Sequence, residues 1–180
     1  MSDTNSALIA FVGVLAGGYL NNFLGEDFKR FRDGQALAGS LAGELASHAT
    51  AIPMLLTMFR GMANALLTED AKMTLYEFNP PTSPVFDASA SKLGMLGPSL
   101  AHEVAFVYEQ IRAFRSMFRD ISIHYEDMPR DGMANACDHC LTLLDTAQSR
   151  GTKLIADLQE FANDGYWRTR PWLRWTRNLG

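Results

Sequence analysis

The sequence predicts an all-α protein in which an N-terminal transmembrane helix continues into a long cytoplasmic helix, packed into a three-helix antiparallel bundle with a long ordered loop. Two observations support this fold class. An uncharged apolar stretch lies near the N-terminus, and three long runs follow in which apolar residues recur in alternating steps of four and three. We therefore expect a transmembrane helix (residues 6–25), a cytoplasmic helical bundle (residues 26–164, with the loop at 68–97) and a basic, Trp-rich tail (residues 165–180).

The expected transmembrane helix carries no charged residue between positions 6 and 25. About 20 helical residues span about 30 Å, the hydrocarbon thickness of a bilayer. Lys29, Arg30 and Arg32 follow directly, and positive residues stay on the cytoplasmic side, so we expect the N-terminus outside and the bulk of the chain inside. The alternative is a buried core helix of a soluble protein, because glycines and asparagines weaken the apolar character of the segment.

Gly13 and Gly17 form a G-x-x-x-G pair on this segment, and Asn21 follows at the same four-residue step. Small residues let two helix backbones approach closely, and an amide on the same face can hydrogen-bond across the contact. The pattern predicts a homo-oligomer or a membrane-protein partner at this face.

The first cytoplasmic pattern runs from Leu24 to Phe59 with an Ala-rich middle, and Pro53 should kink or break it near Ile52. The second pattern covers residues 98–123. The third covers residues 131–163, and its register passes through Gly151 without a slip, which indicates one long helix.

The stretch between the first two patterns, residues 68–97, has no convincing period but contains enough apolar residues to pack along the bundle. Two courses remain open. If the stretch runs back toward the membrane, the C-terminal tail ends near the lipid; if it turns at the distal tip, the tail ends far from it.

The chain resembles a widespread group of uncharacterised small bacterial membrane proteins with one N-terminal membrane helix. The resemblance covers residues 6–120 and rests on a P-V-[FY]-[DE] segment, a K-L-G-x-L segment and an aromatic residue in the following helix. The matching positions are Pro84, Val85, Phe86, Asp87, Lys92, Leu93, Gly94, Leu96 and Tyr108. The resemblance implies this topology and a place in the bacterial inner membrane, with no activity to transfer.

No catalytic, cofactor or metal site is predicted. Cys137 and Cys140 fall on the apolar seam of the third pattern, so core packing is the preferred interpretation over metal binding. Glu44 and His48 share a helix face and could ligate a metal only together with residues such as His102 and Glu103. The two cysteines in the chain favour a reducing compartment.

Arg112, Arg115 and Arg119 form a stripe on the second helical pattern. We interpret this stripe as a solvated face, with a docking strip for an acidic partner as the alternative.

The tail interleaves tryptophans and arginines: Trp167, Arg168, Arg170, Trp172, Arg174, Trp175 and Arg177. Such a composition suits the inner leaflet of a membrane or a protein interface, and less often a merely disordered end. Residues 1–164 hold all 20 acidic residues and the whole chain carries a net charge of −4, so no nucleic-acid partner is expected.

These features favour a membrane-tethered accessory, assembly or scaffold subunit of a larger complex, without catalysis of its own. The rival interpretation is a small-ligand or metal-binding sensor or enzyme. It would use a cleft between the loop at 68–97 and the bundle, with Tyr76, Asp87, His102 and Glu103 as its polar groups.

Overall fold

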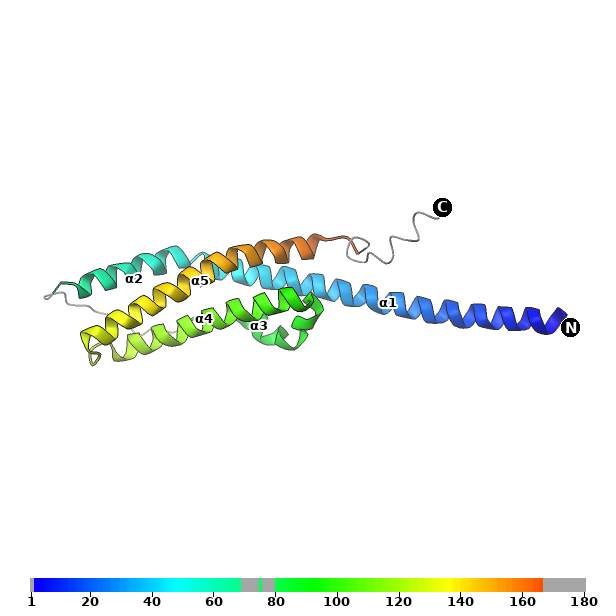
Figure 1. Cartoon of the computed structure of the whole chain (residues 1–180), viewed down its shortest axis with the longest axis horizontal. Helices are drawn as coiled ribbons and strands as arrows, with labels where there is room; N and C mark the ends of the chain where they lie inside the picture. Colours follow the sequence, from blue (N-terminus) through cyan, green and yellow to red (C-terminus); the bar gives the residue numbers. More distant parts are fainter. Residues whose placement is uncertain (1, 69–74, 76–79, 167–180) are drawn as a thin grey trace.

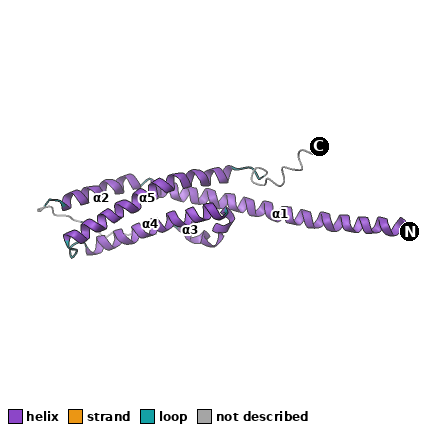
Figure 2. Cartoon of the chain, in the orientation of Figure 1, coloured by secondary structure: helices purple, strands orange, loops and turns teal. Residues whose placement is uncertain are grey.

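The computed structural model describes residues 2–68, 75 and 80–166, with the backbone alone at residues 2–9 and 20. Within this part of the chain every regular element is helical, as predicted (Figure 2). In chain order the elements are α1 (Ser2–Ala49), α2 (Ile52–Leu66), α3 (Pro84–Ser89), the 3-10 helix η1 (Ala90–Leu96), α4 (Pro98–His124) and α5 (Arg130–Asn163).

The long helices run along one axis (Figure 1). α1 and α2 follow one another in the same direction, α4 runs parallel to them, and α5 returns in the opposite direction and packs on all three. The prediction of an antiparallel bundle is therefore correct for α5 and wrong for α4. The physical reason is the connection that precedes α4, which carries the chain back along α1.

Contacts along α1 show the direction of that connection. Ser83 lies beside His48, Val85 beside Glu44, and Met95 against Gly34. Of the two courses that the sequence left open, the chain takes the one that runs back toward the N-terminal end. The second half of the expected loop is not irregular, because Pro84–Leu96 forms α3 and η1 on the surface of α1 and α4.

The break predicted at Pro53 is confirmed, since α1 ends at Ala49 and α2 begins at Ile52. A proline in the first turn of a helix loses no hydrogen bond there, because the first amides of a helix have no intrahelical acceptor. α4 and α5 also match their predicted ranges to within a residue, and α5 continues through Gly151 as one helix.

The buried apolar side chains form two clusters along the bundle. The first joins α1, α3, η1, the first half of α4 and the second half of α5. The second joins α2, the second half of α4 and the first half of α5. The predicted seams supply most of both clusters. Leu37, Leu41 and Tyr108 lie outside those seams and are also buried, because α3 and η1 cover a second side of α1 and α4.

The N-terminal part of α1 extends beyond the bundle (Figure 1). Every side chain from position 10 to 19 is exposed, so the alternative of a buried core helix within this chain is wrong. Among the helices whose side chains are described, none is long and apolar enough to cross a membrane, and the transmembrane helix expected at residues 6–25 has no support from that finding.

Candidate functional site

Glu44 joins three elements through its carboxylate. Oε1 accepts a hydrogen bond from the backbone N–H of Val85 (2.9 Å), and Oε2 accepts one from the N–H of Phe86 (3.1 Å). These amides belong to the first turn of α3, where they have no intrahelical acceptor. Oε2 also accepts a hydrogen bond from the Tyr108 hydroxyl on α4 (2.7 Å). A side chain of α1 therefore caps α3 and holds it against α4.

Tyr108 reinforces this junction with its ring. It stacks on Phe86 with 4.0 Å between the ring centroids and 12° between the planes. Burial, followed by the hydrogen bond to Glu44, raises the pKa of Tyr108 well above its usual range. The phenol therefore remains a hydrogen-bond donor to the carboxylate at every physiological pH.

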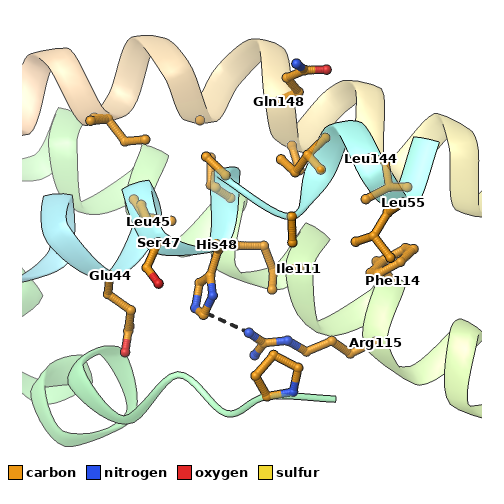
Figure 3. Close-up of a pocket in the computed structure, with 18 of the residues that line it drawn as sticks. Glu44, Leu45, Ser47, His48, Leu55, Ile111, Phe114, Arg115, Leu144 and Gln148 are labelled. Atoms are coloured by element: carbon orange, nitrogen blue, oxygen red, sulfur yellow. Dashed lines mark hydrogen bonds between the residues drawn. The ribbon is translucent and has the colours of Figure 1, made fainter. Parts of the chain in front are cut away.

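His48 lies one helical turn beyond Glu44 and contacts Ser83 and Arg115. Its Nε2 is 3.3 Å from Nη2 of Arg115 (Figure 3). The same Nε2 is 3.3 Å from Oγ of Ser83, and Nη1 of Arg115 donates to this Oγ at 2.8 Å. A guanidinium can only donate hydrogen bonds, so Nε2 must accept and the neutral ring carries its proton on Nδ1. Burial and the charge of Arg115 lower the pKa of His48, although Glu44 opposes the shift.

A pocket of about 660 Å³ opens beside these polar groups, at the break between α1 and α2. Its walls come from α1, α2, α4, α5 and the segment before α3. Apolar side chains dominate them: Leu45, Ile52, Leu55, Ile111, Phe114 and Leu144. Glu44, His48 and Arg115 supply the charged and titratable groups of the lining (Figure 3). The volume falls in the range of about 300–1,000 Å³ that is usual for small-molecule sites.

Of the polar groups expected in the rival cleft, Asp87, His102 and Glu103 do not line this pocket. Tyr76 lies outside the described residues. Asp87 faces Arg112 at 3.8 Å, His102 is exposed, and Glu103 forms a bidentate pair with Arg150 of α5. A cleft between the returning segment and the bundle does exist, but Glu44, His48 and Arg115 provide its polar groups.

The interpretation of the arginine stripe on α4 as a solvated face is wrong at one position. Arg112 and Arg119 are exposed, whereas Arg115 is half-buried under the segment before α3. Burial lowers the pKa of Arg115, against the attraction of Glu44 and Asp87. The sequence carries one sign of the polar group formed by Glu44, His48 and Arg115, namely the one-turn spacing of Glu44 and His48. Their partners could not be predicted while the course of residues 68–97 was open.

Cys137 and Cys140 are fully buried in the second core cluster, as core packing predicts. Within the described residues, no group of three or more His, Cys, Asp or Glu side chains is placed to hold a metal ion. Glu44 and His48 approach Tyr108, Ser83 and Arg115 instead of the ligands considered from the sequence.

Gly13, Gly17 and Asn21 lie on the exposed part of α1. A Cβ placed on either glycine would meet no atom within 4 Å. No described residue therefore covers their face, and the partner expected there stays a prediction. The predicted contact residues of the tail, Trp167, Arg168, Arg170, Trp172, Arg174, Trp175 and Arg177, lie outside the described residues.

Tyr166, at the start of that tail, packs against α1. The Tyr166 hydroxyl donates to Oδ2 of Asp27 at 2.8 Å, and its ring packs edge-on against Phe28 and Phe31, with centroid distances of 5.2 and 5.3 Å. Gln35 secures the end of α5 nearby, since its Nε2 donates to the carbonyl oxygens of Ala162 (3.0 Å) and Asp164 (2.7 Å). The tail therefore begins beside residues 27–31, directly after the uncharged segment.

Four of the nine positions on which the expected resemblance rests lie at the junction of α1, α3 and α4. Pro84 opens α3, Val85 and Phe86 donate to Glu44, and Tyr108 stacks on Phe86. Their arrangement gives these positions a structural role in attaching α3 to the bundle. In comparisons with protein-family models, curated proteins and solved structures, the chain matches none of them.

Proposed function

We propose that the protein is a membrane-tethered accessory or scaffold subunit without catalysis of its own, acting through helix and tail contacts with a larger complex. The exposure of the N-terminal part of α1 carries this proposal. Phe11, Val14 and Tyr19 are 63%, 73% and 74% exposed, on a helix that has no charge between residues 6 and 25. A concentration of exposed large apolar side chains is typical of a surface that contacts a membrane or another protein.

The position of the tail supports the same orientation. Tyr166 lies against Asp27 and Phe28, so the tail starts beside the cluster of Lys29, Arg30 and Arg32. Cytoplasmic positive charges of this kind flank membrane helices, and tryptophan and arginine favour the head-group region. In this proposal the N-terminus is outside the bacterial inner membrane, the bundle is cytoplasmic, and the tail contacts the inner leaflet.

Membrane attachment can be tested by carbonate extraction of membranes from cells that express the full chain. We expect the wild type to stay in the pellet and Val14→Lys to move to the supernatant, because a lysine at the centre of a membrane helix costs about 2.5–3.5 kcal/mol on insertion. Met54→Lys is the matched control, since Met54 is a 68% exposed apolar residue of α2. Release of the wild type by carbonate would contradict the proposal.

The glycine face can be tested by disulfide cross-linking in the same membranes. Cys137 and Cys140 are buried, so an introduced cysteine is the reactive thiol. If Gly17 lies in a homodimer contact, Gly17→Cys should cross-link, whereas Leu15→Cys, about 160° away around the helix, should not. Equal cross-linking at the two positions would exclude a specific self-contact. In that case we expect a stoichiometric membrane partner to co-purify with the protein in mild detergent. Purification as a lone monomer would contradict the accessory role.

A further inference from the structure

The pocket at the break between α1 and α2 is a consequence of backbone geometry and side-chain size. α1 ends at Ala49, and the facing positions of α5 are Ala147 and Gly151, which are too small to fill the gap. The pocket therefore lies between the two core clusters, where side chains from both approach without meeting. Its apolar walls suit a hydrocarbon or aromatic group, because burying such a surface is favourable.

Arg115 is the distinctive polar group of this pocket. Its hydrogen bonds within the described residues go to Ser83 and His48, which are both neutral. No carboxylate of the described chain lies within ion-pair distance of it. Arg150 shows how this fold treats another half-buried arginine. It binds Glu103 with contacts of 2.6 and 2.7 Å and covers the ring of Phe106 at 3.8 Å.

The carboxylate of Glu44 does not compensate Arg115 directly. Both of its oxygens accept hydrogen bonds from other donors, namely two amides of α3 and the Tyr108 hydroxyl. A guanidinium has five N–H donors in a planar fork, and a carboxylate matches that fork with two oxygens. Among the described residues Arg115 thus keeps unused donors at the edge of an apolar pocket.

We propose that this pocket binds a small amphipathic monocarboxylate, with its carboxylate on Arg115 and its apolar part between α1, α4 and α5. Among the described residues Arg115 has no ion-pair partner, so the carboxylate of a ligand can take that position. The neutral Nε2 of His48 and the Ser83 hydroxyl hold the guanidinium in position. This proposal does not depend on membrane attachment, because it concerns the bundle alone.

Octanoate is a suitable probe, and 1-octanol is its uncharged counterpart with the same chain. Both are titrated by calorimetry into the full chain in nanodiscs, with empty nanodiscs as the blank. We expect saturable binding of octanoate that is at least about tenfold tighter than that of octanol, since a charge-assisted hydrogen bond contributes enough for such a factor.

Two variants test the two halves of the site. Arg115→Gln should weaken octanoate binding about tenfold or more and leave octanol binding unchanged, whereas Ala147→Leu should fill the pocket and abolish both. Arg112→Gln is the control, because Arg112 lies on the same helix, is 60% exposed and does not line the pocket. Thermal unfolding of each variant confirms that it is folded.

Three results would overturn the proposal. These are no saturable binding of octanoate to the wild type, equal affinity for octanoate and octanol, or unchanged octanoate binding in folded Arg115→Gln. Unchanged binding in folded Ala147→Leu would place the ligand elsewhere, for example on the exposed part of α1, and would also reject this pocket.

Discussion

The Tyr108 hydroxyl donates to Oε2 of Glu44 at 2.7 Å, across 64 residues of sequence. The same carboxylate accepts the first amides of α3, so this single contact connects α1, α3 and α4. Glu44→Gln keeps the shape but leaves one acceptor instead of two charged oxygens. We expect it to lower the free energy of unfolding by about 1.5–3 kcal/mol, measured by urea denaturation.

A double-mutant cycle with Tyr108→Phe isolates the contact itself. We expect a coupling energy of about 0.5–3 kcal/mol, because the two groups share one hydrogen-bond network. Glu109→Gln is the control: Glu109 is the exposed neighbour of Tyr108 and pairs only with Arg112, so its loss should change stability by less than about 0.5 kcal/mol. Additive effects of Glu44→Gln and Tyr108→Phe would mean that the two residues act independently.

A second prediction concerns the close approach of η1 to α1. A Cβ on Gly34 would lie 3.0 Å from the carbonyl oxygen of Met95 and 3.5 Å from Cε1 of Phe161. A Cβ on Gly43, in the same helix, would meet nothing within 4 Å. Replacing a helical glycine by alanine gains about 0.5–1 kcal/mol when there is room. Gly43→Ala should therefore raise the melting temperature, and Gly34→Ala should not.

Gly34→Ala and Gly43→Ala make the same substitution in the same helix, so the gain in helix propensity is equal in both. A difference between their melting temperatures therefore reports the surroundings of the two positions. An equal rise in melting temperature for both would show that η1 does not pack against Gly34 as described. The test also reports on α3, because α3 and η1 are consecutive and are held to α1 at Glu44 and Gly34, respectively.

These contacts show how far sequence patterns reach in this fold. Apolar periodicity predicted α4 and α5 almost to the residue, because each buries one continuous stripe of side chains. Proline chemistry predicted the break at Pro53. Glu44 was not predicted as a cap, since its acceptor role depends on backbone amides of Val85 and Phe86, and backbone amides leave no trace in side-chain patterns.

The orientation of the connection before α4 explains the other errors. Arg115 was expected on a solvated face, and it is half-buried because Ser83 lies over it. The parallel direction of α4 follows from the same return of the chain along α1. Long-range placement of this kind depends on the sum of many weak contacts, and no local motif in residues 68–97 encodes it.

A third prediction concerns pH. Burial, with the charge of Arg115, lowers the pKa of His48 below the 6.5 of the unfolded chain. The folded state then binds fewer protons than the unfolded state in the interval between the two values, so stability rises with pH there. The contribution of neutral His48 to stability should be fully present above about pH 6.5. It should decline as the pH falls toward the lowered pKa of His48 in the folded protein.

The measurement is urea denaturation of wild type and His48→Gln across this interval. The variant should lose the part of the pH dependence that comes from His48, while His139→Gln, at an exposed position of α5, should keep it. An identical pH profile for wild type and His48→Gln would contradict the neutral, accepting imidazole that the contacts with Ser83 and Arg115 require.

A fourth prediction follows from the buried thiols. Cys137 and Cys140 are both 0% exposed, and burial together with the neighbouring Cys137 raises the pKa of Cys140 to about 12. Because the thiolate is the reactive form, alkylation by iodoacetamide should be very slow in the folded protein and rapid in denaturant. Fast labelling of either cysteine at neutral pH under native conditions, measured by mass spectrometry, would contradict their place in the core.

The last prediction tests how the end of α5 is fixed to α1. Gln35 donates from Nε2 to the carbonyl oxygens of Ala162 and Asp164. Ala162 belongs to the last turn of α5, where the carbonyl groups lack an intrahelical donor. Gln35→Glu replaces the Nε2 donor by a carboxylate that faces the same oxygens and the negative end of the helix dipole. We expect a loss of about 1–3 kcal/mol in the free energy of unfolding.

Gln148→Glu is the control, because it makes the same change at an exposed position of α5, far from the C-terminal end of that helix. Hydrogen exchange should show where the loss occurs, with faster exchange at the amides of the last turn of α5 and at Tyr166, and unchanged exchange near Cys140. Gln35→Met should give a smaller loss, since it removes the donor without adding a negative charge. Equal losses for Glu and Met would mean that side-chain packing, and not the hydrogen bonds, holds this end of α5.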